Sequence, residues 1–260
     1  MMKKAKLSLL ILLLVQPWSL SLAEIIKSHF YKVKVSKATL LTSRTLDAVE
    51  PYSRLTPFLP CASVCNLDPE CQLWCHESLN RECLLSDMFV MPTYVETNMA
   101  DALTCYTKRH KDLATGAYAE GSALSIDFPR RTVENLADGI YDRQNMLQCF
   151  MTGNSVYQPW FLLDFGEPVA FRVVTFFAQS TGAASFVRNI GEMEIRVGMV
   201  AVGSPGDFSS YDLIGSFPGP ATEYDQEIFF EFPTPITARF LAVQKMMADT
   251  KFQVCHLEVY

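Results

Sequence analysis

Residues 61–85 read CASVCNLDPECQLWCHESLNRECLL, and this stretch organises the interpretation of the whole chain. Six of the eight cysteines lie between Cys61 and Cys105, whereas Cys149 and Cys255 stand far apart and bracket most of the remaining chain. A dense cluster followed by one long-range pair is typical of two disulfide-bonded domains of different kinds. The cysteine distribution therefore predicts two such domains.

The first 23 residues, MMKKAKLSLLILLLVQPWSLSLA, have the pattern of a secretory signal peptide. Three lysines precede an unbroken apolar run from Leu9 to Val15, and Ser21-Leu22-Ala23 offers small residues flanking a cleavage point. The alternative is a membrane anchor, but this apolar run is too short to span a bilayer, and no later segment is apolar enough. We therefore expect a secreted, extracellular protein with oxidised cysteines and no transmembrane segment.

Net charge limits the classes of ligand, and chain length indicates the number of domains. The chain has a net charge of -6, and removing the three lysines of the signal leaves 19 basic against 28 acidic side chains. Such an acidic protein is a poor candidate for binding nucleic acid or anionic lipid. Roughly 237 residues after the signal fit two domains. The segment 108–123, KRHKDLATGAYAEGSA, lacks apolar periodicity and is expected to be a solvated linker between domains at 24–107 and 124–260.

The first domain combines strand and helix patterns. Apolar and polar residues alternate from Phe30 to Ser36, as in a strand. Cys61 and Cys65 are four residues apart and would share one face of a helix. Pro60 suits the start of that helix, and the run 66–69 suits its end.

This cluster resembles the PAN/apple module over roughly residues 26–107. The resemblance rests on the C-x3-C spacing, a short turn containing an aspartate, Trp74 soon after Cys71, and the later CLL at 83–85. It implies a small α+β domain in which the bridges Cys61–Cys83 and Cys65–Cys71 fix a helix to a sheet, leaving Cys75 to pair with Cys105. The chain departs from the family pattern because no cysteine occurs between Glu24 and Pro60.

A zinc site is the alternative for this cluster, since Cys71, Cys75 and His76 lie close together. A clean second pair of ligands is lacking, and an oxidising compartment favours disulfides. His76 beside Cys75 also suggests an activated nucleophile, but a bridged cysteine is not nucleophilic. We favour disulfides over both alternatives.

The second domain reads as short apolar runs separated by turns. Strand-like segments rich in aromatic and β-branched residues alternate with Gly- and Pro-containing turns, without helical periodicity between them. This pattern indicates an all-β sandwich or barrel. The strand-like segments are WFLLDF, FRVVTFFA, MEIRVGMV, EIFFEF, ARFLAV and HLEVY.

These segments resemble the discoidin, or coagulation factor V/VIII type C, domain, particularly its fucolectin-like branch, over about residues 120–260. The resemblance implies a jelly-roll β-sandwich of the galactose-binding type, in which Cys149 and Cys255 form a bridge, and a mainly β protein overall. Five matches occur in the family's order: NLADG at 135–139, PWFLLDFG at 159–166, MEIRVG at 193–198, ARFLAVQ at 238–244 and VCHLEVY at 254–260.

The resemblance also locates a ligand site, which this sequence changes. Fucose-binding members use a histidine and two arginines, whereas Met151 stands near the histidine position and Gln179 near the first arginine. Arg188 lies near the second arginine. The donors that hold fucose are thus mostly lost, and we expect no fucose binding. Trp160 could stack on a sugar, but the family's pattern places that aromatic in the core.

The family's calcium site is matched only in part. Asp138 would be its single carboxylate, since Gln148 replaces a serine and His256 replaces an acid. Calcium prefers anionic oxygen ligands, so we expect weak binding or none, and no other cofactor. The residues matching the calcium pattern are Asn135, Asp138, Ile140 and Cys255.

No catalytic motif is evident: the sequence lacks G-x-S-x-G, H-E-x-x-H and a phosphate loop, and its four histidines are scattered. We therefore expect a non-enzymatic, lectin-like protein that binds extracellular carbohydrate or glycoprotein ligands. The alternative is a structural or adhesive protein that acts only through protein–protein contacts.

Overall fold

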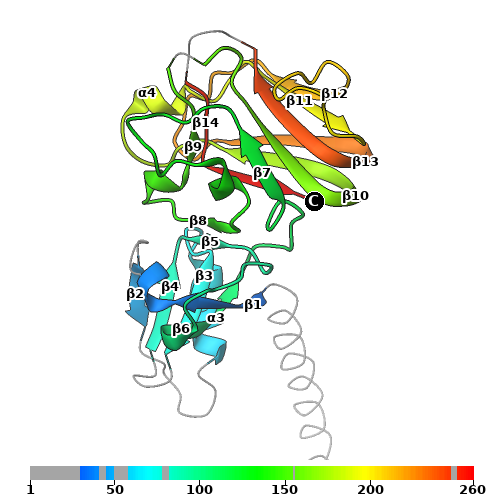
Figure 1. The fold of residues 1–260 in the computed structure, drawn as a ribbon. Coiled ribbons are helices and arrows are strands. Elements are labelled where there is room, and N and C mark those ends of the chain that lie inside the picture. The colour runs from blue at the N-terminus through cyan, green and yellow to red at the C-terminus, as the bar shows by residue number, and fades with distance from the viewer. Residues whose placement is uncertain (1–29, 41–44, 50–57, 78–81, 155, 247–250) are drawn as a thin grey trace, which may run out of the picture.

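The computed structural model describes residues 30–40, 45–49, 58–77, 82–154, 156–246 and 251–260 as a mainly β protein (Figure 1). A small disulfide-rich unit with one five-stranded sheet comes first, and a larger β-sandwich follows. The signal peptide expected at 1–23 lies outside the described residues. None of the helices among the described residues is long and apolar enough to cross a bilayer.

The first sheet is antiparallel and has a helix packed against it. Its alternating strand pattern is confirmed in β1, where Val33 and Val35 are buried and face the core. Helix α3 (Phe58–Leu67) contains the C-x3-C segment and begins two residues before Pro60. The strand order is β1 (Tyr31–Ser36), β6 (Ala102–Thr107), β3 (Leu73–Glu77), β4 (Glu82–Ser86) and β2 (Thr45–Val49).

Three disulfides hold this unit together. Cys61–Cys83 links α3 to β4, and Cys65–Cys71 links α3 to the turn before β3. Cys75–Cys105 joins directly opposite positions on neighbouring strands β3 and β6. These are the pairs that the family resemblance implies. The buried ring of Trp74 fills the space beside them and stacks on Tyr106 with centroids 4.3 Å apart.

The sandwich is built around two long strands. β10 (Trp160–Phe177) and β13 (Glu227–Lys245) each cover two of the segments expected as separate strands, and they pair antiparallel along their length with register shifts. β7 (Tyr118–Gly121) pairs with the first part of β10, and β15 (His256–Val259) pairs with the last part. β11 (Met193–Gly198) and β12 (Asp212–Phe217) complete the sheet.

One side of each long strand builds the sandwich core. Phe161, Leu163 and Phe176 of β10 are buried there, together with Leu241 and Val243 of β13. Successive side chains of a strand point to opposite faces of the sheet, so Leu162 and the Trp160 ring face away from the core. The Cys149–Cys255 bridge ties the segment before β9 (Phe150–Met151) to the segment after β14 (Gln253–Val254), in agreement with the family resemblance.

The segment expected to be a solvated linker, 108–123, is packed against the sandwich. Its residues 118–121 form β7, and Ala114 and Ala119 are buried in the sandwich core. The backbone N–H of Leu113 donates to the carbonyl of Val259 at 2.8 Å. The segment lacks strong periodicity because small alanines supply its buried positions, and the solvated interpretation was therefore wrong.

The two units share a hydrogen-bonded and apolar junction (Figure 1). β5 (Phe89–Val90) of the first unit pairs with β8 (Ile140–Tyr141) of the second. Phe89 contacts Tyr141 and Phe177 edge-on at centroid distances of 5.5 and 5.4 Å. These contacts make the junction a continuous core between the units.

Candidate functional site

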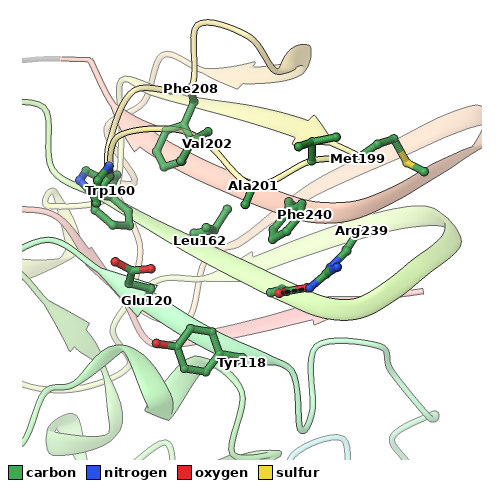
Figure 2. Close-up of a pocket in the computed structure, with 13 residues that line it drawn as sticks. Tyr118, Glu120, Trp160, Leu162, Met199, Ala201, Val202, Phe208, Arg239 and Phe240 are labelled. Atoms are coloured by element: carbon green, nitrogen blue, oxygen red, sulfur yellow. Dashed lines mark hydrogen bonds and ion pairs between the residues drawn. The ribbon is translucent and has the colours of Figure 1, made fainter.

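A cavity lies on the outer face of the sandwich, opposite the core. It has a volume of about 470 Å³ and opens between β7, the β10–β13 pair and the loop 199–208 that follows β11 (Figure 2). Strand alternation places its lining side chains outward, because their neighbours Phe161, Leu163 and Leu241 point into the core. Cavities of this size accommodate small ligands.

Aromatic rings form much of the cavity wall. Phe208 and Phe240 are buried beneath it, and Trp160 is half-buried and meets Phe208 edge-on at 5.4 Å. Tyr118 at the edge is 68% exposed. Trp160, expected in the core, instead packs in a small cluster on the outer face, because Phe161 takes the inward position. Its partly open ring is available to a ligand.

An ion pair forms part of the cavity lining. The Arg239 guanidinium donates from Nε to Oδ1 of Asp164 at 2.8 Å and from Nη2 to Oδ2 at 2.9 Å. These hydrogen bonds hold the pKa of Asp164 below its ordinary value, with the N–H of Gly166 also donating to Oδ1. The pair is therefore charged and fixed, and its remaining donors and acceptors can meet polar groups of a ligand.

The loop 199–208 is held in place by hydrogen bonds. Gln244 of β13 donates from Nε2 to the carbonyl of Gly206 at 3.0 Å, and the Tyr211 hydroxyl donates to the carbonyl of Val200 at 2.9 Å. Gly206 has a φ of +83°, and a Cβ built there would lie 2.6 Å from Nε1 of Trp160. The close approach of this backbone to the indole fixes the wall of the cavity.

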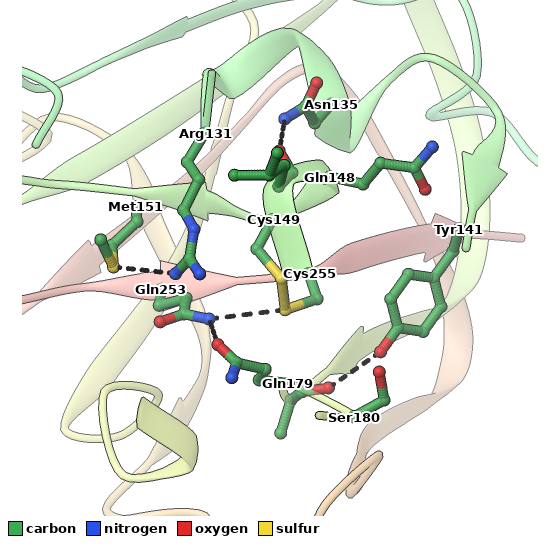
Figure 3. The surroundings of a disulfide bond; sticks show 12 residues. Arg131, Asn135, Tyr141, Gln148, Cys149, Met151, Gln179, Ser180, Gln253 and Cys255 are labelled. Carbon is green, nitrogen blue, oxygen red and sulfur yellow. Dashed lines mark hydrogen bonds between the residues drawn. A yellow bond between two sulfur atoms is a disulfide. The ribbon is translucent and has the colours of Figure 1, made fainter. Parts of the chain in front are cut away.

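The two ligand residues suggested by the resemblance lie elsewhere. Gln179 is buried beside the Cys149–Cys255 bridge, where its Nε2 donates to the carbonyl of Thr181 and its Oε1 accepts from Nε2 of Gln253 (Figure 3). Its amide group is therefore occupied by the protein itself. Arg188 is exposed at the end of helix α4 (Ala184–Val187).

A buried arginine occupies the neighbourhood of Met151, at the position of the family's histidine. Arg131 donates from Nη1 to Sδ of Met151 at 3.2 Å (Figure 3). Its Cζ lies 4.5 Å from the Phe128 ring centre. The arginine is fully buried, so this region is filled by the protein's own side chains. Sequence reasoning missed Arg131 because it lies outside the segments that carry the family resemblance.

The residues matching the calcium pattern mainly hold the backbone. Asn135 donates from Nδ2 to the carbonyls of Arg130 and Leu147, both at 3.1 Å, and Oδ1 of Asp138 accepts from the N–H of Ile140. The N–H of Cys255 donates to the carbonyl of Phe177. Within the described ranges, no three His, Cys, Asp or Glu side chains are grouped to hold a metal ion.

The position expected to hold an acidic calcium ligand, residue 256, is part of the junction between the units. His256 is buried and stacks on Tyr141 with centroids 5.5 Å apart and planes 8° apart. Its Nε2 lies 3.4 Å from Oε1 of Glu258. The ring is therefore held by an aromatic and a carboxylate of the protein.

Four separate segments contribute to the outer cavity, which explains why the sequence did not reveal it. Tyr118 and Glu120 come from the supposed linker, and the register places them opposite Asp164 and Leu162 of β10. The available signal was the alternation in WFLLDF, which sets Trp160, Leu162 and Asp164 on one face. That signal cannot identify the partner strand.

Comparisons with known proteins found structures of lectins and carbohydrate-binding modules. No family model and no curated protein matches the sequence. A fucolectin from striped bass (Morone saxatilis) serum is 17% identical, covers 74% of this chain and 73% of its own, and has a TM-score of 0.44. The lectin domain of lectinolysin, complexed with Lewis B antigen, is 16% identical over 58% of this chain and 96% of its own, at a TM-score of 0.44. A family 32 module of C. perfringens NanJ, in complex with galactose, is 15% identical. It covers 55% of this chain and 92% of its own, and its TM-score is 0.41.

Proposed function

We propose that this chain is a secreted, non-catalytic recognition protein that binds carbohydrate, free or on glycoproteins, in the outer cavity of its sandwich. The observation that carries the proposal is the combination of the Trp160 and Tyr118 rings with the fixed Asp164–Arg239 pair around one open cavity. In this proposal the first unit is a PAN/apple-like module and the second a discoidin-like domain.

The chemistry of the cavity suits a sugar ring. A pyranose has apolar C–H faces, which pack on aromatic side chains, and equatorial hydroxyls, which need polar partners. Trp160 and Tyr118 offer the first kind of surface, and Asp164 with Arg239 offers acceptors and donors. Because the ion pair is already formed, binding requires little rearrangement of these two side chains.

A glycan array with the full secreted protein tests the proposal. We expect reproducible binding, and we expect Tyr118→Ala to weaken it at least tenfold by removing an exposed ring from the cavity. Tyr157→Ala is the matched control, since Tyr157 is 71% exposed but does not line the cavity. Silence of the wild-type protein across the array would contradict carbohydrate binding and favour a purely adhesive role.

A further inference from the structure

Charge in the outer cavity is not balanced. Asp164 is paired with Arg239 through two hydrogen bonds, which leaves Glu120 as the remaining acidic side chain of the lining. Glu120 is exposed, and none of the described residues forms an ion pair or hydrogen bond with its carboxylate. The cavity therefore carries a net negative charge.

The aromatic walls reinforce this charge. Glu120 lies between Trp160 and Tyr118, and its carboxylate points toward the space beside the indole (Figure 2). The faces of aromatic rings carry negative potential and attract cations within about 6 Å. A carboxylate flanked by two such rings is complementary to an ammonium group. The excess of acidic over basic side chains in the whole chain, 28 against 22, would further favour the approach of a cation.

From this arrangement we infer that the preferred ligand is a saccharide with a free, protonated amine, which Glu120 and the two rings recognise together. The inference rests on the proposed function and specifies its substrate class. An acidic sugar would be repelled by Glu120, and Arg239 is held by Asp164 rather than free to offset that repulsion. A neutral N-acetylated sugar could stack on the rings but would leave Glu120 without a partner.

Two oligosaccharides that differ only in the substituent at C2, a free amine in one and an acetamido group in the other, test this inference. The trimer of β-1,4-linked glucosamine is compared with the trimer of N-acetylglucosamine by titration calorimetry at pH 6 and low salt. An exposed ion pair and a cation–π contact together favour the amine-bearing trimer by about tenfold. Raising the salt concentration should weaken that trimer selectively, because screening acts on the charge alone.

Glu120→Gln tests whether Glu120 causes the preference for the amine-bearing trimer. This substitution keeps the size of the side chain and removes its charge, so we expect the glucosamine trimer to lose about tenfold in affinity and the acetylated trimer to change less than twofold. Glu134→Gln removes an exposed carboxylate outside the cavity and should leave both affinities unchanged. Because Glu120 is exposed, thermal unfolding should show that both variants fold as the wild type does.

The outcomes separate this inference from the proposed function. Equal or tighter binding of the acetylated trimer would overturn the amine preference while carbohydrate binding stands. Equally tight binding of trilysine would also overturn it, since the site would then select any polycation. If neither trimer binds but the array shows another glycan, only the amine inference fails; if the array is silent as well, both proposals fail.

Discussion

The guanidinium of Arg109 donates from Nε to Oε1 of Glu258 at 2.9 Å and so connects the end of the first unit to the last strand of the sandwich. Arg109 also lies over the Phe89 ring, with Cζ 4.0 Å from its centre. On the other side, Nε2 of His256 is 3.4 Å from the same carboxylate oxygen. Glu258 is only 3% exposed, so these side chains, rather than solvent, surround its carboxylate at the junction of the units.

Stability should therefore depend on the ionisation of Glu258. Burial raises the pKa of this carboxyl, but its close contact with His256 and the hydrogen bonds and positive charge of Arg109 more than offset that effect and lower it from 4.5 to about 2. A lowered pKa gives stability that is fully present above about 4.5 and is lost as the pH falls toward 2. The contribution at neutral pH is up to about 3 kcal/mol.

Glu258→Gln measures this contribution. We expect the variant to be less stable than the wild type at pH 7 and the gap to shrink by about 2 kcal/mol at pH 3, where the carboxyl is protonated in the unfolded chain but still mainly ionised in the folded protein. Urea unfolding at several pH values gives both free energies. A gap that stays constant from pH 7 to pH 3 would show that Glu258 keeps an ordinary pKa.

Phe89→Ala should loosen the junction. The ring is buried, and its edge-on contacts with Tyr141 and Phe177 supplement a β5–β8 pairing of only two residue pairs. Loss of a buried phenylalanine costs roughly 3–5 kcal/mol, and we expect the two units to unfold in separate transitions. Differential scanning calorimetry would detect the second transition.

The matched control for that experiment is Leu67→Ala at the end of helix α3. Leu67 is 86% exposed, so its loss should change the free energy of unfolding by less than about 0.5 kcal/mol. If Phe89→Ala leaves one sharp transition near the wild-type temperature, the aromatic contacts do not couple the units.

Sequence patterns predicted the parts of this protein that depend on local alternation. Val33 and Val35 face the core as the alternation around them indicates. The disulfide pairings that the PAN/apple resemblance implied are the ones found in the first unit. Trp160 shows what local alternation cannot predict. The run WFLLDF fixes which residues share a face, but not which face is the core, and a shift of one position exchanges the two. Phe161 took the core and Trp160 the outer face.

The outer cavity could not be predicted for a related reason. Tyr118 and Glu120 reach Asp164 and Leu162 only through the β7–β10 pairing, and the pattern of residues 108–123 was too weak to indicate a strand. The loop after β11 contributes Phe208 through a backbone course set by Gly206. Tertiary pairing, rather than local periodicity, brings these residues together.

Removing the disulfide that closes the longest loop and removing the one that closes the shortest loop should destabilise the protein by different amounts. Cys149–Cys255 spans 106 residues and Cys65–Cys71 spans 6, and all four cysteines are buried. In the chain-entropy model, the longer loop contributes about 4–5 kcal/mol and the shorter about 2. Paired alanine substitutions, followed by chemical denaturation, give the two losses. Since lost packing is similar in both variants, equal losses would contradict the loop-length explanation.

Gly206→Ala should alter the cavity without removing any side chain from it. Gly206 has a φ of +83°, and its new Cβ would lie 2.6 Å from Nε1 of Trp160, so the indole must shift. We expect a loss of about 1–2 kcal/mol in stability, because alanine is strained at positive φ, and at least a fivefold loss in affinity for the glycan found on the array.

Gly203→Ala in the same loop is the matched control. A Cβ at Gly203 meets no atom within 4 Å, and its backbone is not in the positive-φ region. We expect stability within about 0.5 kcal/mol of the wild type and affinity within twofold. Loss of binding in both variants would indicate that the loop as a whole, rather than the Trp160 ring, contacts the ligand. If Gly206→Ala binds as the wild type does, the indole is not the platform, and the carbohydrate site must lie on another surface.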